Sequence, residues 1–290
     1  RAQIEYLNIQ LILSSLDNDF EAASGYCEAL MLACEQAPKV REKVVRTYYA
    51  AVYNQCIYQM KQGKHNAGFE LLAKFRGYTK EVNSSKAEFF HAYYILLCAT
   101  SLHVGQPERI IGVLEKIEAE WRLLEGKIQR LHDLRLRFWI AYAFFMNNEP
   151  SRALKWINEL LSESRSDIQI DLLTNGKLLN ILIHLELGNF SLVESETSSV
   201  RRILEKHGRY HDFEKHMVKF ARALARAGNG PEYQKTIQTW YKKWQQIETD
   251  PQKGIWALNP TGWLHQKVTG EQMADFQKKA NGVVGFLMPF

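Results

Sequence analysis

The sequence predicts an all-α protein, an α-solenoid of about six antiparallel helical hairpins with an irregular C-terminal capping segment. Nearly every stretch of the 290 residues repeats its apolar side chains at helical spacing, without the period-two alternation of a strand. Only 7 prolines and 17 glycines interrupt the chain, which favours long helices. Six similar turns, spaced 40 to 45 residues apart, indicate that the helices form repeated pairs.

The six turns have the same chemistry. Each begins with Gly or Asn, which most readily adopt the left-handed backbone conformation that ends a helix. Each then opens a new helix, in two cases with proline at the third position, where the missing N–H costs least. The turns are NDFEAA (18–23), GKHNAG (63–68), GQPERI (105–110), NEPSRA (148–153), GNFSLV (188–193) and GNGPEY (228–233).

The helix before a turn carries a pattern of large, large, small and large side chains. Before Gly105 and Gly228 the pattern is Tyr94, Leu97, Cys98, Ser101 and Met217, Phe220, Ala221, Leu224. On these residues and turns, positions 1–248 resemble a tetratricopeptide-repeat (TPR) protein. The spacing exceeds the family's unit of roughly 34 residues, and HEAT repeats of about 40–47 residues share it. The small-residue position and the Gly or Asn turns favour the TPR-like interpretation.

The resemblance implies a right-handed superhelix whose first helices line a concave groove. Equivalent groove positions in three successive units are 40 residues apart. They are Arg135, Asn175 and Lys215, then Tyr142, Leu182 and Arg222, then Met146, Glu186 and Arg226.

A basic stripe, defined as Lys215, Lys219, Arg222 and Arg226, runs along one side of the helix that contains EKHMVKFARALARAG. Helix surfaces are usually charged, so the stripe can be a merely solvated surface. Alternatively it is the wall of a groove for an acidic peptide, a terminal carboxylate or a phosphate, acceptors that guanidinium groups bind through paired hydrogen bonds. The predicted partner-binding residues are Arg135, Tyr142, Asn175, Lys215, Lys219, Arg222 and Arg226.

The charge distribution agrees with an anionic partner. The net charge is +5, but residues 201–243 hold eleven Lys or Arg against four Asp or Glu. The pI of 8.9 is low for a nucleic-acid-binding domain, and aromatic residues do not interleave with the basic ones. The longest apolar run, FWIAYAFFM (138–146), is shorter than the roughly 20 residues of a membrane span. The expected partner is therefore a protein or peptide with acidic or phosphorylated groups.

No catalytic signature occurs in the sequence, so no enzyme activity and no cofactor are expected. His207, His211 and His216 lie close in sequence, but Gly208 should break the helix between the first two. The spacing of the last two splays their side chains, so no metal site is predicted. Two functions remain, a non-catalytic protein- or peptide-binding module and a ligand-sensing regulatory domain of a larger protein with an N-terminal output domain.

The repeat pattern stops near residue 248, and residues 249–290 are expected to form the capping segment. One short helix is predicted there, over 271–280, with Trp256 and Trp263 covering the apolar end of the last hairpin. The four cysteines, at 27, 34, 56 and 98, lie in helical segments without a regular framework. They are expected to be packed free thiols, which suits a reducing, cytoplasmic location.

Overall fold

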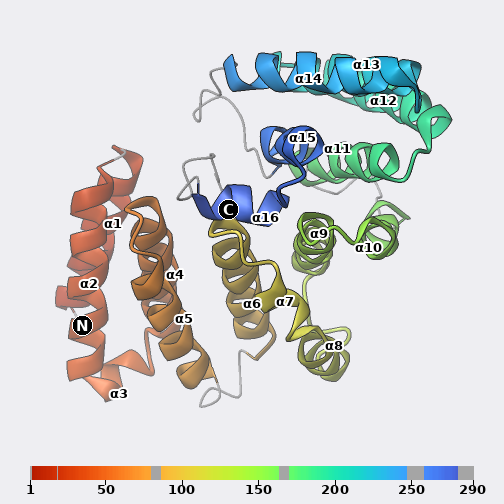
Figure 1. Ribbon diagram of the computed structural model, residues 1–290. Helices are drawn as coiled ribbons and strands as arrows, with labels where there is room; N and C mark the ends of the chain where they lie inside the picture. Colours follow the sequence, from red (N-terminus) through yellow and green to blue (C-terminus); the bar gives the residue numbers. More distant parts are fainter. Residues whose placement is uncertain (1, 18, 80–85, 163–169, 247–257, 280–290) are drawn as a thin grey trace. The chain divides into compact units, whose positions relative to one another are not determined.

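The computed structural model describes residues 2–17, 19–79, 86–162, 170–246 and 258–279 (Figure 1). Helices make up 84% of the structure, and no strand occurs in these ranges, which confirms the all-α prediction. The helices are α1 (Ala2–Leu16), α2 (Phe20–Gln36), α3 (Pro38–Arg41), α4 (Val45–Lys61), α5 (His65–Thr79), α6 (Lys86–His103), α7 (Glu108–Ile111), α8 (Leu114–Leu123), α9 (Arg130–Met146), α10 (Pro150–Ser162), α11 (Ile170–Glu186), α12 (Phe190–Lys206), α13 (Asp212–Ala227), α14 (Pro231–Gln246), α15 (Pro260–Thr269) and α16 (Met273–Lys279).

The predicted turns separate consecutive helices. Their first residues have positive φ angles at all five positions where the structure describes them, which are Gly63, Gly105, Asn148, Gly188 and Gly228. Asn148, with φ of 60°, is the one non-glycine residue with positive φ in the described part of the chain. The positive φ angle expected from the sequence is therefore confirmed at these turns, and at Gly228 it is combined with a ψ of −144°, outside the left-handed helical region.

Most helices pack against their neighbours in sequence. Neighbouring helices pack together in the pairs α1–α2, α4–α5, α9–α10, α11–α12 and α13–α14. The single helix expected after Gly105 is divided into α7 and α8 around Gly112.

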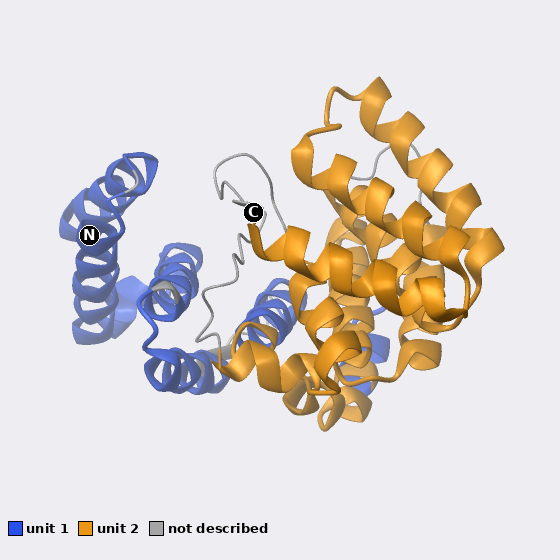
Figure 2. Cartoon of the chain, turned by 45° about the horizontal axis from the view of Figure 1, so that its top comes forward, with its two compact units in different colours: residues 1–100, 119–127 blue, residues 101–118, 128–290 orange. Residues whose placement is uncertain are grey.

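The chain divides into two compact units (Figure 2). Unit 1 comprises residues 1–100 and 119–127, and unit 2 comprises residues 101–118 and 128–290. The divide passes through α6 and α8, each of which contributes a stretch to both units.

The core of unit 1 is rich in aromatic side chains and thiols. The ring of Tyr49 lies 4.9 Å from that of Phe75 and 4.0 Å from that of Phe89. All four cysteines are buried and free, as predicted. Burial raises the pKa of Cys27 and of Cys56 to about 12, so both thiols stay protonated and are poor nucleophiles at neutral pH.

The core of unit 2 centres on α9, whose residues from Phe138 to Met146 are all buried. A helix that is apolar on every side needs neighbours on every side. Helices α7, α10 and α11 supply three of them. The C-terminal segment, residues 258–279, adds a further contact.

Candidate functional site

The C-terminal segment, residues 258–279, makes specific contacts with the rest of unit 2. It contains two helices where the sequence suggested one, because α15 forms in a stretch expected to be irregular. Asn259 caps α15, since its side-chain oxygen accepts a hydrogen bond from the backbone N–H of Gly262 at 2.8 Å. The backbone N–H of Asn259 donates to the hydroxyl of Tyr142 on α9 at 3.0 Å.

Trp263 is the main apolar anchor of α15. Its side chain is 2% exposed, and its ring lies 5.7 Å from that of Phe220 on α13. The indole N–H donates to a carboxylate oxygen of Glu186 on α11 at 2.8 Å. Lys267 forms an ion pair with the other oxygen of Glu186 at 2.6 Å. The N-cap residue Asn259 therefore contacts α9, and α15 itself contacts α11 and α13 and packs along α14. Trp256 lies outside the described residues.

Helix α16 contacts the turn after α6. The side-chain amide of Gln277 donates to the backbone carbonyl of His103 at 3.1 Å, and Gln277 also accepts from Asn259. A Cβ atom at Gly105 would lie 2.2 Å from the carbonyl oxygen of Ala274, so only glycine allows this approach.

These contacts change the interpretation of the predicted groove residues on α9 and α11. Tyr142 is buried and held by Asn259. Asn175 is buried, and its amide donates to the carbonyl of Asp171 in its own helix at 2.9 Å. Arg135 is half-buried on α9. Glu186, also expected in the groove, binds Trp263 and Lys267. On α9 and α11 the chain's own C-terminal segment thus contacts two of the predicted groove positions.

The basic stripe lies together on α13, away from the apolar side that includes Phe220 and Leu224. Lys219 and Arg226 are exposed, and Lys215 and Arg222 are half-buried. Acidic residues stand near its two ends. Lys215 lies 3.4 Å from a carboxylate oxygen of Asp212, and Arg226 lies 3.8 Å from one of Glu194 on α12. Both ion pairs are open to solvent, and ion pairs of this kind contribute little to stability.

Arg222, in the middle of the stripe, is positioned by neutral groups. Its Nε donates to the hydroxyl of Thr197 at 3.1 Å, and one terminal nitrogen donates to the hydroxyl of Ser198 at 3.0 Å. Both hydroxyls donate their own protons to the carbonyl of Glu194, which turns their lone pairs toward the guanidinium. Arg222 is therefore held in place by two of its five N–H donors, and the described residues show no partner for the other three.

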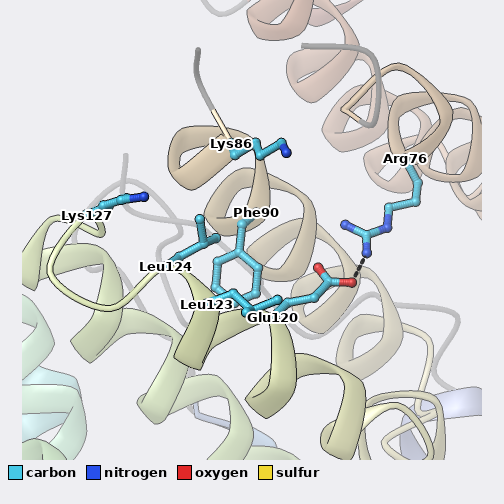
Figure 3. Close-up of a pocket in the computed structure, with 7 residues that line it drawn as sticks. All are labelled: Arg76, Lys86, Phe90, Glu120, Leu123, Leu124 and Lys127. Atoms are coloured by element: carbon cyan, nitrogen blue, oxygen red, sulfur yellow. Dashed lines mark hydrogen bonds and ion pairs between the residues drawn. The ribbon is translucent and has the colours of Figure 1, made fainter. Parts of the chain in front are cut away.

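A separate pocket of about 490 Å³ lies within unit 1, in the range typical of small-ligand sites (Figure 3). Helices α5, α6 and α8 and the residues after α8 form it. Its lining residues are Arg76, Lys86, Phe90, Glu120, Leu123, Leu124 and Lys127. This site was not expected from the sequence, since its residues come from three separate stretches of the chain. The one feature of the sequence that could have indicated this site is the pair Leu123 and Leu124 beside the turn at Gly126.

Helix α1 carries an exposed apolar surface that was not expected from the sequence. Its members recur at helical spacing, so a surface of this kind could have been recognised from periodicity. They are Tyr6, Ile9, Ile12, Leu13 and Leu16, each about half exposed or more.

The histidine cluster has a structural role. His211 is the N-cap residue of α13, and its backbone N–H donates to Glu214 at 3.2 Å. The ring of His216 lies 2.6 Å from the carbonyl oxygen of Asp212. Within the described ranges, no group of three His, Cys, Asp or Glu side chains is arranged to hold a metal ion. None of the helices described has the length and apolar character to cross a membrane.

Comparison of the chain with protein-family models, with curated proteins and with solved structures gives no match.

Proposed function

We propose that the chain is a non-catalytic, TPR-like helical-repeat protein that binds an acidic or phosphorylated segment of a partner protein. The left-handed turns support the repeat architecture, as does the packing of neighbouring first helices, α9 on α11 and α11 on α13. In this proposal the binding surface is the basic stripe together with the adjoining edge of α12.

The observation that carries the proposal is the environment of Arg222. Two neutral hydroxyls fix its guanidinium, so its orientation is set without cancelling its charge. A carboxylate or phosphate can accept the remaining donors in the paired geometry that makes such contacts strong. Lys219, exposed on the same face, adds a second charge for which the described residues show no ion-pair partner.

The first-helix residues Tyr142 and Glu186 are not part of the proposed surface, because the C-terminal segment already holds them. The apolar surface of α1 also supports an interaction role, since exposed apolar patches commonly mark protein contacts.

The test is a fluorescence-anisotropy titration with a labelled peptide that carries four glutamates, and with a peptide in which glutamines replace them. The glutamate peptide should bind at least about tenfold more tightly, the effect of one good charge-assisted hydrogen bond. The variant K219Q/R222Q should lose this preference. The control K206Q/K235Q removes two charges from the same basic region but outside the stripe, and it should keep the preference. If both variants lost this preference equally, the preference would depend on net charge alone, which would contradict the proposal.

The pocket in unit 1 favours the second function, a ligand-sensing regulatory domain. A small ligand there would stabilise unit 1, which a thermal-shift measurement on the full chain detects.

A further inference from the structure

We infer that the pocket in unit 1 binds an apolar monocarboxylate, a small molecule with one carboxylate at the end of an aliphatic or aromatic body. This inference does not depend on the proposed binding at the basic stripe, because none of the stripe residues lines the pocket.

The apolar lining of the pocket combines a buried aromatic ring with an exposed leucine. Phe90 is 3% exposed, and its ring is fixed by Tyr94 at 4.9 Å and by Trp121 at 6.4 Å. Leu123 is 79% exposed, although it stands beside this aromatic cluster. Leu124, half-buried, completes the apolar lining (Figure 3). An apolar ligand body would cover Leu123 and remove its surface from water, which is favourable.

Two of the charged residues of the pocket neutralise each other. Arg76 forms an ion pair with Glu120, and both side chains are largely buried. The guanidinium carbon also lies 4.7 Å from the ring centre of Tyr93 and 5.3 Å from that of Tyr94, and Arg76 donates to the Tyr94 hydroxyl at 3.4 Å. Arg76 is therefore committed to the protein, and the pair adds no net charge to the pocket.

The other two charges, Lys86 and Lys127, are exposed. Among the described residues neither ammonium group has an ion-pair partner. The pocket therefore carries two net positive charges beside an apolar lining. A carboxylate can be placed between the lysines with its apolar body on Phe90, Leu123 and Leu124. Lysine suits this role as a flexible point charge.

The apolar lining explains why one carboxylate is preferred to two. A carboxylate held by both lysines uses the two cations of the pocket that have no ion-pair partner among the described residues. A second carboxylate at the other end of the same apolar body would lie against Phe90, Leu123 and Leu124, where no such cation offsets the loss of its hydration. The pocket should therefore discriminate against dicarboxylates of equal length.

Isothermal titration calorimetry on the full chain tests the inference with four probes. Decanoate and 4-phenylbutyrate are monocarboxylates with an aliphatic and an aromatic body, respectively. Decanol lacks the charge, and decanedioate carries two. At least one monocarboxylate should bind, and for decanoate the affinity should exceed those of decanol and decanedioate by roughly tenfold, the factor of one charge-assisted contact. If only one of the two acids binds, the result shows whether the pocket prefers an aliphatic or an aromatic body.

Three variants locate the site. K86M/K127M should weaken binding of the acid by about tenfold or more, and L123D should weaken it by placing a carboxylate in the pocket. All three positions are exposed, so folding should be retained. K116M, on an exposed position of α8 that does not line the pocket, should bind as the parent does. The inference is overturned if neither acid binds, if decanol binds as tightly as decanoate, or if K86M/K127M binds like K116M.

Discussion

The backbone N–H of Asn259 donates a hydrogen bond to the hydroxyl of Tyr142, across 117 positions of the sequence and at 3.0 Å. The contact joins the start of α15 to the middle of α9. It gives the hydroxyl of the buried Tyr142 a partner and fixes where the C-terminal segment meets the rest of unit 2.

Replacing Tyr142 with phenylalanine should therefore lower the free energy of unfolding by about 1–3 kcal/mol, because a buried N–H loses its acceptor. Urea unfolding followed by tryptophan fluorescence measures the change. The control is Tyr6→Phe, at a residue that is 57% exposed, which should change stability by less than about 0.5 kcal/mol. Equal effects at the two sites would show that the contact with Asn259 contributes nothing.

Trp263 should be the most costly side chain to remove from α15. Trp263→Ala deletes an indole that is 2% exposed and leaves a cavity beside Phe220, so a loss of about 3–5 kcal/mol is expected. Val268→Ala, on the same helix at a residue that is 38% exposed, should cost well under 1 kcal/mol. A Trp263 variant as stable as the parent would mean that α15 does not anchor unit 2.

The docking of α16 can be tested with two glycines of similar φ. Gly105 and Gly188 have φ angles of 68° and 74°, but only at Gly105 would a methyl group strike α16. Gly188→Ala should cost about 1–2 kcal/mol from backbone strain alone. Gly105→Ala should cost clearly more and should also speed amide hydrogen exchange over Met273–Lys279. If exchange in α16 responds identically to the two changes, the close approach is not a feature of the folded protein.

Glu214 should make stability depend on pH. Burial raises its pKa from 4.5 to about 7, against the opposing effect of its hydrogen bonds. Between these values the folded state binds more protons than the unfolded state, so stability should fall as pH rises from about 4.5 to 7 and then level off. Glu214→Gln keeps an acceptor for the N–H of His211 and removes the titration.

The Gln variant should therefore match the parent near pH 4 and exceed its stability at pH 8 by on the order of 1–3 kcal/mol. Urea unfolding at the two pH values measures the difference. If the difference in stability between the variant and the parent were the same at both pH values, Glu214 would not be the group responsible for the pH dependence.

The hairpin turns could be predicted because their chemistry is local. A left-handed residue must be Gly or Asn in most sequences, and Asn148 illustrates the second case. The division of the predicted helix after Gly105 into α7 and α8 could not be predicted with the same rule, since Gly112, where α7 ends, has a negative φ of −66°.

Helix α15 was missed although local signals were present. Asn259 as N-cap, Pro260 at the first turn and Gly270 after the last residue are standard helix boundaries. The stretch around it contains two tryptophans and several glycines, which favoured an irregular segment over a helix. Its contact with Tyr142 could not be foreseen, because partners so far apart in sequence are selected by tertiary packing alone.

The candidate sites show the same limit. The basic stripe was visible because its residues share one helix face. What the sequence could not show is that hydroxyls of Thr197 and Ser198 hold Arg222, or that Lys86 and Lys127 meet the same pocket. Both depend on which faces of separate helices are brought together.

The central claim, that an acidic partner segment binds at the basic stripe, is tested most directly by photo-crosslinking. A glutamate-rich peptide with a benzophenone side chain is irradiated with the full chain, and the adducts are mapped by mass spectrometry. We expect adducts in peptides from α12 and α13. These adducts should be lost in K219Q/R222Q and at high salt, because salt screens exposed charges. Adducts that map to other helices, or that persist unchanged in the variant and in salt, would contradict it.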